Sequence, residues 1–344
     1  MSSSTARNAG QVEIFSTCVQ SRDEDPESYL ERVAEVARWS DSARYRGILV
    51  YTDNGLIDPW LVAQLILQRT EHLCPLVAVQ PVYMHPYSVA KMVASLAYLH
   101  RRRIYLNMVA GGFRNDLLAL GDDTAHDDRY ERVVEYTLIV KRLLNGQAVT
   151  VDGRYYKVKN LKLAPQLPPE LAPGLLISGS SEAGARAAEM ISATRVKYPQ
   201  PPGEEELQSV NGSGPAGIRV GIITRPQADE AWDVAQTRFP EDRKGQITHN
   251  LAMRVSDSKW HQQLSRLGGH PVSEANPYWL VPFENYKTFC PYLVGSYDRV
   301  GSELARYMSL GFSTFILDVP FSPEDLDHTA MAFGCAERIL GTRA

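Results

Sequence analysis

The chain has 344 residues and a formal net charge of −4 at pH 7. This charge argues against nucleic acid or an anionic membrane as the main partner, because both require a basic surface. The four cysteines include no CxxC pair, so neither a zinc site nor a disulfide framework is indicated. No apolar run has the length of a membrane-spanning helix, and residues 1–10 predict a disordered leader on a cytoplasmic protein.

Apolar runs of strand length alternate with amphipathic segments of helix length along the chain. The predicted strands are Val12–Ser16, Gly47–Tyr51, Leu76–Gln80, Ile104–Val109, Gly174–Ser178, Ala193–Lys197, Ile218–Thr224 and Thr314–Asp318. The predicted helices between them include Pro26–Ser42, Pro59–Thr70, Tyr87–His100, Tyr130–Leu144 and Glu182–Ile191. Alternating β and α elements predict a parallel sheet, and eight strands favour a closed (β/α)8 TIM barrel, here a single domain over residues 11–344.

Two segments interrupt this alternation. Residues 149–163 alternate with period two around Asp152-Gly153, which predicts a β-hairpin before the fifth strand. Residues 243–292 form a long, aromatic-rich insertion after the seventh strand. An insertion of this length in a barrel is typical of a lid or of an oligomer contact, and both interpretations stay open.

A barrel gathers the carboxyl ends of its strands at one mouth, where the active sites of this fold lie. The side chains predicted near this mouth are Thr17, Cys18, Thr52, Asp53, Asn54, Gln80, Asn107, Ser178, Lys197, Tyr198, Arg219, Thr224 and Asp318, with His85 just after the third strand. They include neither a metal-ligand cluster nor a histidine pair for proton transfer. Such a mouth suggests that a bound organic cofactor carries the chemistry.

Two motifs at strand ends point to a ligand. Asn107 interrupts an apolar strand, and a buried amide needs either a ligand or a neighbouring strand end to satisfy its hydrogen bonds. The run from Ser178 to Ser181 joins a strand to a helix, an arrangement that presents donors to a phosphate. The alternative is that Ser180 or Ser181 only caps the helix.

Several segments occur in an order that resembles a known family. They are YTDNGLIDPWLVA (51–63), LVAVQPVYMHPYSVAKMVASL (76–96), LNMVAGG (106–112), DDRYE (127–131), VDGRYYKVKNLKL (151–163) and GIRVGIITRPQADEAW (217–232). Together they resemble the luciferase-like flavin-dependent monooxygenases, nearest to the alkanesulfonate monooxygenase branch. The resemblance implies a TIM barrel with reduced FMN in its mouth.

The resemblance also implies roles for individual residues. Asn107, Ala110 and Gly111 would contact the isoalloxazine ring, Tyr130 would reach the phosphate region, and Ser178, Gly179, Ser180 and Ser181 would bind the phosphate. Asp53, Asn54, His85, Lys197 and Tyr198 are the candidates for substrate binding. Arg219, Cys18 and Asn107 are the catalytic candidates, with Arg219 stabilising a negative peroxide or anchoring an anionic substrate.

The chain departs from the alkanesulfonate branch at several of its functional positions. Cys18 and Gly221 stand where that branch carries histidines, Leu56 replaces a cysteine, and Tyr198 replaces a tryptophan. The neighbouring Arg219 is kept. We therefore expect a related oxygenation of a different small organic substrate.

In this family a separate reductase supplies reduced FMN, which reacts with O2 at C4a to give a peroxide that oxygenates the substrate. The resemblance further implies a homodimer or homotetramer. The alternatives are an F420-dependent hydride-transfer oxidoreductase and a flavin-binding protein without turnover. A sugar-phosphate lyase or isomerase is disfavoured, because only Asp318 and Lys197 offer a base at the strand ends.

Overall fold

The computed structural model describes residues 12–201, 214–255 and 276–342; the predicted leader at 1–10 lies outside them. Eight parallel strands form a barrel: β1 (Glu13–Thr17), β2 (Gly47–Val50), β3 (Cys74–Val79), β4 (Tyr105–Met108), β7 (Leu175–Ser178), β8 (Thr194–Lys197), β9 (Ala216–Arg225) and β12 (Phe312–Leu317). Pairing of β8 with β9, β9 with β12 and β12 with β1 closes it. The predicted TIM barrel is confirmed, and each predicted strand overlaps one of these.

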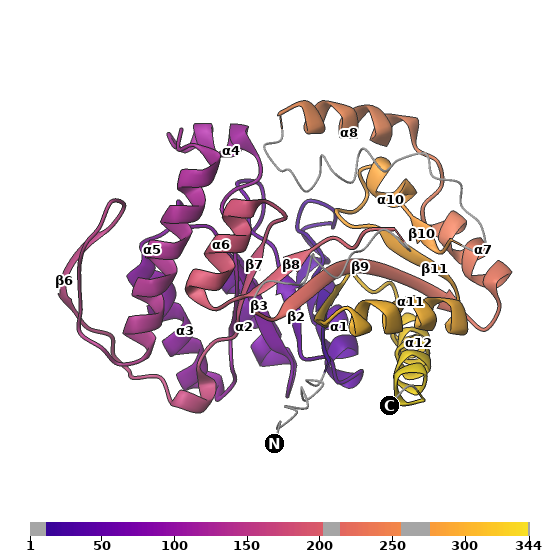
Figure 1. The fold of residues 1–344 in the computed structure, drawn as a ribbon, viewed down its shortest axis with the longest axis horizontal. Helices are drawn as coiled ribbons and strands as arrows, with labels where there is room; N and C mark the ends of the chain where they lie inside the picture. Colours follow the sequence, from indigo (N-terminus) through magenta and orange to yellow (C-terminus); the bar gives the residue numbers. More distant parts are fainter. Residues whose placement is uncertain (1–11, 202–213, 256–275, 343–344) are drawn as a thin grey trace, which may run out of the picture.

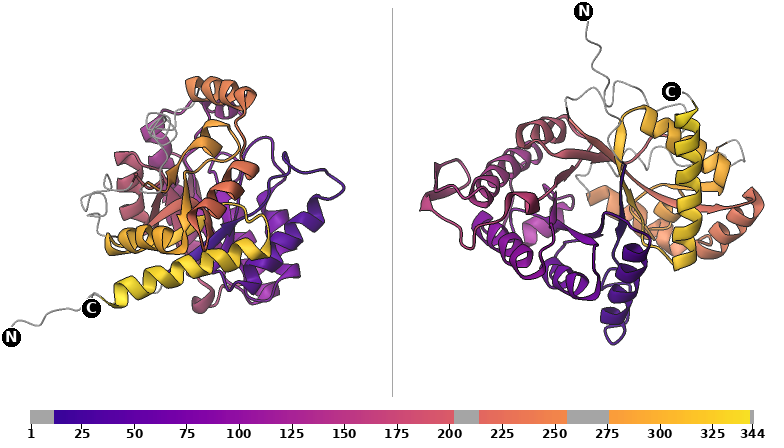
Figure 2. Two further views of the ribbon diagram at one scale, coloured as in Figure 1. Left: turned by 90° about the vertical axis from the view of Figure 1, so that its right-hand side faces the viewer. Right: turned by 90° about the horizontal axis from the view of Figure 1, so that it is seen from below.

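Helices surround the strands (Figures 1 and 2). They are α1 (Tyr29–Ser42), α2 (Pro59–Arg69), α3 (Pro86–His100), α5 (His126–Leu144), α6 (Glu182–Ile191), α7 (Ala228–Arg238), α11 (Tyr297–Ser309) and α12 (Pro323–Gly341). Two shorter helices are α4 (Arg114–Ala119) and the 3-10 helix η1 (Pro169–Leu171). Among the described residues, no helix combines the length and apolarity needed to cross a bilayer.

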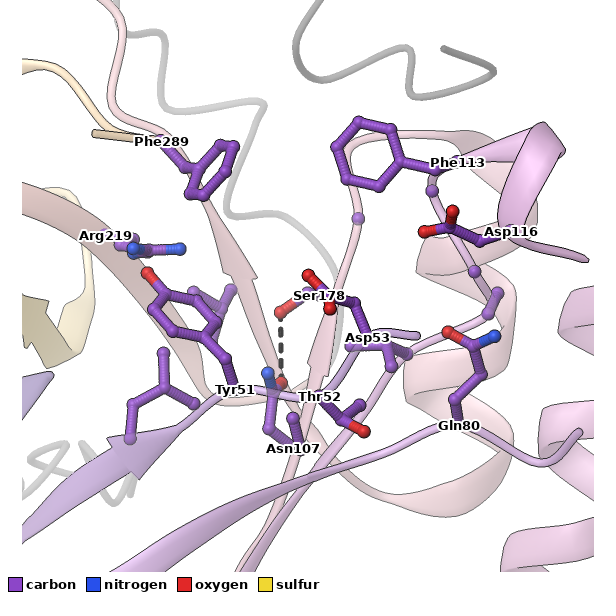
Figure 3. A pocket seen from close by; sticks show the side chains of 18 of the residues that line it. Tyr51, Thr52, Asp53, Gln80, Asn107, Phe113, Asp116, Ser178, Arg219 and Phe289 are labelled. Atoms are coloured by element: carbon purple, nitrogen blue, oxygen red, sulfur yellow. Dashed lines mark hydrogen bonds between the residues drawn. The ribbon is translucent and has the colours of Figure 1, made fainter. Parts of the chain in front are cut away.

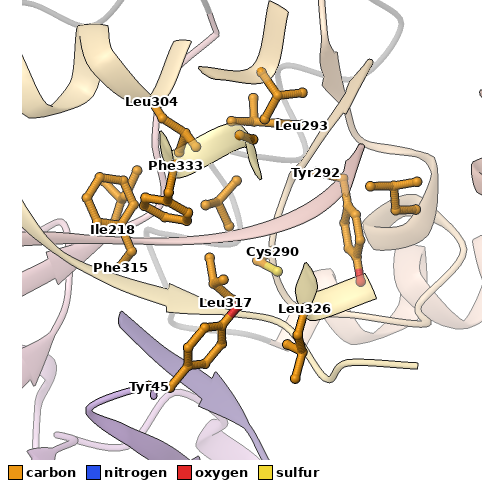
Figure 4. Close-up of a cluster of buried hydrophobic side chains, with 14 of the residues drawn as sticks. Tyr45, Ile218, Cys290, Tyr292, Leu293, Leu304, Phe315, Leu317, Leu326 and Phe333 are labelled. Carbon is orange, nitrogen blue, oxygen red and sulfur yellow. The ribbon is translucent and has the colours of Figure 1, made fainter. Parts of the chain in front are cut away.

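Strand alternation decides which side chains fill the barrel. One set of buried side chains packs inside it: Phe15, Leu49, Cys74, Leu76, Tyr105, Leu176, Val196 and Ile316. Their neighbours in the same strands point outward and pack against the helices, since successive side chains of a strand lie on opposite faces. Ile218, Phe315 and Phe333 belong to one such outer cluster (Figure 4). The cavity described below lies above the inner set, at the carboxyl ends of the strands.

The predicted hairpin consists of β5 (Val149–Asp152) and β6 (Lys157–Leu161), which pair antiparallel and project from the barrel (Figure 1). The Glu135 carboxylate on α5 anchors its turn. It accepts hydrogen bonds from the backbone N–H groups of Arg154, Tyr155 and Tyr156 at 2.7 to 3.3 Å. The hairpin is thereby fixed to the outside of the barrel, away from the mouth.

The seventh barrel strand is longer than its neighbours and serves two sheets. Residues 216–220 of β9 pair within the barrel, whereas residues 221–225 pair with β11 (Tyr292–Ser296), a strand that the sequence analysis did not predict. Arg219 therefore lies near the point where β9 leaves the barrel. Thr224, near the end of the predicted strand, is buried in this extension and donates to the Gly295 carbonyl at 2.9 Å.

The predicted insertion after the seventh strand is present. Its described part contains α8 (Arg243–Val255), β10 (Tyr278–Trp279) and α10 (Val281–Glu284), while residues 256–275 lie outside the described ranges. In Figure 1, α8 lies at the top of the molecule, with α10 and β10 below it on the side of β11, while α4 lies at the top above α6.

An ion pair between Asp122, in the loop that follows α4, and Arg132 of α5 predicts an acid-dependent loss of stability. Burial alone would raise the pKa of Asp122, but hydrogen bonds from Arg132 and Thr124 and the charge of Arg132 lower it from 3.8 to about 2. Because the pKa of Asp122 is lower in the folded than in the unfolded chain, the ionised carboxylate stabilises the fold at pH values above the unfolded pKa. This contribution is lost as the pH falls toward 2. Asp122→Asn should thus lower the free energy of unfolding by about 2 kcal/mol at pH 7.

Urea unfolding of wild type and Asp122→Asn at pH 7 and pH 3 measures this contribution. The difference in the free energy of unfolding between the two proteins should shrink at pH 3 to roughly half its value at pH 7, because the carboxyl group of the unfolded chain is mostly protonated at pH 3. A difference that stays constant between the two pH values would contradict the assignment.

Candidate active site

A cavity of about 210 Å³ opens at the carboxyl ends of the barrel strands (Figure 3). Of the predicted residues, it is lined by Thr52, Asp53, Gln80, Asn107, Ala110, Gly111, Tyr130, Ser178, Gly179, Ser180, Ser181, Tyr198 and Arg219. Its other walls include Leu49, Tyr51, Tyr83, Phe113, Asp116, His126, Val196, Phe289 and Ile316. The fold therefore brings most of the predicted positions together.

The amide of Asn107 is buried on β4 and faces the neighbouring strand β7. Its Oδ1 accepts a hydrogen bond from Ser178 Oγ at 3.0 Å (Figure 3). The proposed bond to a neighbouring strand end is therefore present, and the same amide also lines the cavity. The two interpretations of Asn107 are thus compatible, because an amide has donors as well as an acceptor.

The loop between β7 and α6 shows different roles for its serines. Ser181 caps α6, since its Oγ accepts from the Gly184 N–H at 3.1 Å. The capping alternative thus holds for Ser181. Ser180 Oγ is fully buried and has no hydrogen-bond partner among the described residues. A buried hydroxyl without a partner is costly unless a ligand satisfies it.

Tyr130 on α5 packs directly against this loop. Its hydroxyl donates to the Ser178 carbonyl at 3.5 Å, and burial raises its pKa, so it stays protonated near neutral pH. A Cβ atom at Gly179 would collide with the hydroxyl oxygen of Tyr130. Only glycine therefore lets the loop approach the phenol this closely.

Arg219 is the buried cation of the cavity. Its side chain is 9% exposed, and its guanidinium lies 4.8 Å from the centre of the Tyr51 ring. One terminal nitrogen is 3.9 Å from Asp318 Oδ1, which is beyond hydrogen-bond distance. Nε and this terminal nitrogen have no hydrogen-bond partner among the described residues. Two buried donors are thus available to an anion.

Asp318 is held by the last residues of the insertion. Its Oδ2 accepts hydrogen bonds from the Tyr292 hydroxyl at 2.8 Å and from the Thr288 hydroxyl. These bonds occupy Oδ2 and leave Asp318 Oδ1 nearest to Arg219. The carboxylate therefore compensates the charge of the guanidinium but forms no hydrogen bond with it.

The family follows from comparison with known proteins. Residues 11–314 match the family model described as luciferase-like monooxygenase. The chain belongs to the luciferase-like monooxygenase family. The resemblance seen in the ordered sequence segments is thereby confirmed.

The match to one related protein covers most of the chain. It is a 4-(γ-L-glutamylamino)butanoyl-[acyl-carrier protein] monooxygenase of Niallia circulans, 34% identical over 307 residues, which are 87% of this chain and 89% of that protein.

Two solved structures share the fold at 17% identity. Riboflavin lyase, solved with modified FMN and riboflavin, has a TM-score of 0.74 and covers 97% of this chain and 92% of its own. An F420-dependent secondary alcohol dehydrogenase, solved with an F420–acetone adduct, has a TM-score of 0.66 and covers 95% and 99%.

Two predicted residues of this luciferase-like monooxygenase face away from the cavity. Cys18 packs in the cluster between strands and helices, and burial raises its pKa to about 12, so it is neither a cavity wall nor a thiolate. Lys197 places its ammonium over the Phe312 ring at 5.3 Å. Strand alternation explains the Lys197 error, because Val196 on the same strand points inward and its neighbour must point outward.

Two further predicted residues belong to loops beside the cavity and do not line it. Asn54 is exposed and bridges two segments, donating to the Asp116 carbonyl at 3.0 Å and accepting from the Tyr83 hydroxyl at 2.7 Å. His85 caps α3, where its Nδ1 accepts from the Tyr87 N–H at 3.1 Å. Both are better explained as structural residues.

The sequence analysis also missed residues of this luciferase-like site. Tyr51 lies two positions after Leu49 on one strand face, a signal that alternation provides. His126 precedes Tyr130 by one helical turn, and the two rings contact edge to face at 5.3 Å. Phe289 comes from the predicted insertion, and no local pattern placed it over the cavity. The described residues contain no cluster of three or more His, Cys, Asp or Glu that could hold a metal ion.

Proposed function

We propose that this chain is the oxygenating component of a two-component monooxygenase that uses reduced FMN and O2. One observation carries the proposal: Ser180 and Arg219 line one cavity, and Ser180 Oγ and two nitrogens of the Arg219 guanidinium are buried without a hydrogen-bond partner among the described residues. Such groups are costly in an empty site and are satisfied by an anionic ligand.

The described residues fit FMN. The loop from Ser178 to Ser181 begins α6, whose N-terminus favours a phosphate, and Ser180 Oγ offers a further donor. Asn107 and the Ala110-Gly111 turn line the adjoining wall, where the ring system would lie. Bound reduced FMN would supply the electrons that activate O2.

The remaining residues would protect and direct that chemistry. Leu49, Tyr51 and Ile316 form an apolar floor, and Phe113 and Phe289 flank the opening in Figure 3. Such walls reduce the access of water, which otherwise diverts activated oxygen to hydrogen peroxide. Arg219 would stabilise negative charge that develops on oxygen or hold an anionic group of the substrate.

We propose an acyl chain tethered to a carrier protein as the substrate class. The support is the relative that acts on such a substrate at 34% identity over most of both chains. The test is mass spectrometry of 4-(γ-L-glutamylamino)butanoyl carrier protein after incubation with FMN, a flavin reductase and O2. Gain of one oxygen atom supports this substrate class, whereas an unchanged acyl chain alongside normal flavin binding rejects this substrate.

The cofactor is tested by anaerobic titration with reduced FMN and with reduced F420, followed by mixing with O2. Tight binding of reduced FMN and slowed reoxidation relative to free flavin would support the proposal. Preference for F420 would favour the hydride-transfer alternative, which the shared fold of the F420-dependent alcohol dehydrogenase keeps open. Binding of reduced FMN with reoxidation as fast as that of free flavin would favour a flavin-binding protein without turnover.

We further propose that the chain forms a homodimer or homotetramer. Leu61 on α2 and Met92 and Leu99 on α3 are exposed apolar side chains on neighbouring helices. Light scattering coupled to size exclusion should give a multiple of the 38.4 kDa chain mass, and Leu99→Glu should shift it toward the monomer. A wild-type protein that elutes as a monomer at micromolar concentration would contradict this.

A further inference from the structure

Arg195, which the sequence analysis did not single out, lies behind the loop that joins β7 to α6. It belongs to β8 and does not line the cavity. Its Nε donates to the Gly179 carbonyl at 3.3 Å and its terminal nitrogen donates to the Ser180 carbonyl at 3.2 Å. One guanidinium thus holds two successive peptide groups of the loop from the side opposite the cavity.

Tyr130 completes the fixation of this loop. Its hydroxyl donates to the Ser178 carbonyl, so three successive carbonyls, from Ser178 to Ser180, each accept from a side chain. Because a peptide group is planar, fixing its carbonyl also fixes the N–H group of the following residue. The loop and the start of α6 are thereby set in one conformation, and within the described part of the chain the buried Ser180 Oγ has no hydrogen-bond partner.

Among the described residues, no carboxylate compensates the charge of Arg195. Burial lowers the pKa of Arg195 because a buried cation loses hydration. Its hydrogen-bond acceptors are neutral carbonyls, which satisfy the donors without neutralising the charge. A half-buried, uncompensated cation is costly, and a dianion on the cavity side of the same loop would offset that cost.

We propose that Arg195 is a positioning residue for the terminal phosphate of the flavin: it fixes the β7–α6 loop from behind and makes the site select phosphorylated flavin over riboflavin. This inference rests on the proposed function, because it assumes that reduced flavin occupies the cavity. It assigns to Arg195 no contact with the reacting atoms.

The test compares the affinities of reduced FMN and reduced riboflavin, which differ only in the phosphate, by anaerobic titration of the full chain. The variants are Arg195→Met, which keeps the stem, and Arg195→Lys, which keeps the charge but not the planar fork. Arg186→Met is the matched control, since Arg186 is an exposed arginine of α6 that lies near Glu182.

Arg195→Met should lower the preference for FMN over riboflavin by about tenfold or more, with riboflavin affinity changed by less than about threefold. Arg195→Lys should give an intermediate preference, and Arg186→Met should keep the wild-type value. If Arg195 had only a structural role, Arg195→Met would weaken the binding of both flavins equally and leave the ratio of their affinities unchanged.

Two results would overturn the inference. The first is an unchanged ratio of FMN to riboflavin affinity in Arg195→Met, whether or not both affinities fall equally, and the second is a loss of preference in Arg186→Met as large as in Arg195→Met. Should Arg195→Met not fold, as judged by circular dichroism, the ratio in Arg195→Lys decides in the same way. Failure of the proposed function is seen separately, in a wild-type protein that binds neither flavin.

Discussion

Arg219→Met is expected to lower kcat/KM for the carrier-bound acyl substrate by about 10² to 10³, while the affinity for reduced FMN changes by less than about threefold. Two buried donors of Arg219 have no partner in the part of the chain that the structure describes, and a hydrogen bond to a charged group contributes roughly 1.5 to 3 kcal/mol. Methionine keeps the packing against Tyr51 but removes both donors. Arg219→Lys should have a kcat/KM between those of wild type and Arg219→Met, because lysine keeps the positive charge but lacks the planar guanidinium.

Lys287→Met provides the control for Arg219. Lys287 is a half-exposed cation of the segment that carries Phe289, and it pairs with Asp242 at 3.0 Å, so its loss should leave kcat/KM near the wild-type value. Steady-state rates with purified reductase measure all three variants. An Arg219→Met enzyme with wild-type turnover would show that the unsatisfied guanidinium has no part in the reaction.

Gly179→Ala should weaken binding of reduced FMN by up to about 100-fold, since overpacking of a close contact costs roughly 1 to 3 kcal/mol. The added methyl group would collide with the Tyr130 hydroxyl and displace the loop that carries the unpartnered Ser180 hydroxyl. Anaerobic fluorescence titration measures the affinity.

Tyr130→Phe tests whether the collision is the cause. Alone, this change removes one hydrogen bond and should weaken binding by about fivefold. Combined with Gly179→Ala it removes the colliding oxygen, so the double variant should bind reduced FMN more tightly than Gly179→Ala alone. Wild-type affinity in Gly179→Ala, or additive losses in the double variant, would contradict the proposed role of this contact.

The barrel was predictable because buried parallel strands have a plain sequence pattern: all four residues from Gly47 to Val50, for example, are apolar or glycine and buried. The loop from Ser178 to Ser181 was also predictable, because small hydroxyl residues between a strand pattern and a helix pattern are typical of a helix N-terminus. The extension of β9 to pair with β11 was not, because its partner strand is about 70 residues away and local patterns do not reveal such pairings.

The errors in the site concern residues whose strand or loop was placed correctly but whose side chain does not point into the cavity. Lys197 is one residue from Val196 and therefore points to the opposite side of β8. His85 lies on a loop whose helix it caps. Arg195 was overlooked because it contacts the loop that follows the neighbouring strand β7. Only the pairing of β7 with β8 brings Arg195 next to that loop, and this pairing cannot be read from the local sequence.

The most direct test of the central claim is a crystal structure of the protein with FMN bound. The account predicts a flavin in the cavity at the carboxyl ends of the strands, with its phosphate bonded to Ser180 Oγ and the start of α6, its ring against Asn107 and the Ala110-Gly111 turn, and the Arg219 guanidinium facing the reactive side. A well-defined flavin outside this cavity, or one whose phosphate lies away from the loop between Ser178 and Ser181, would contradict it.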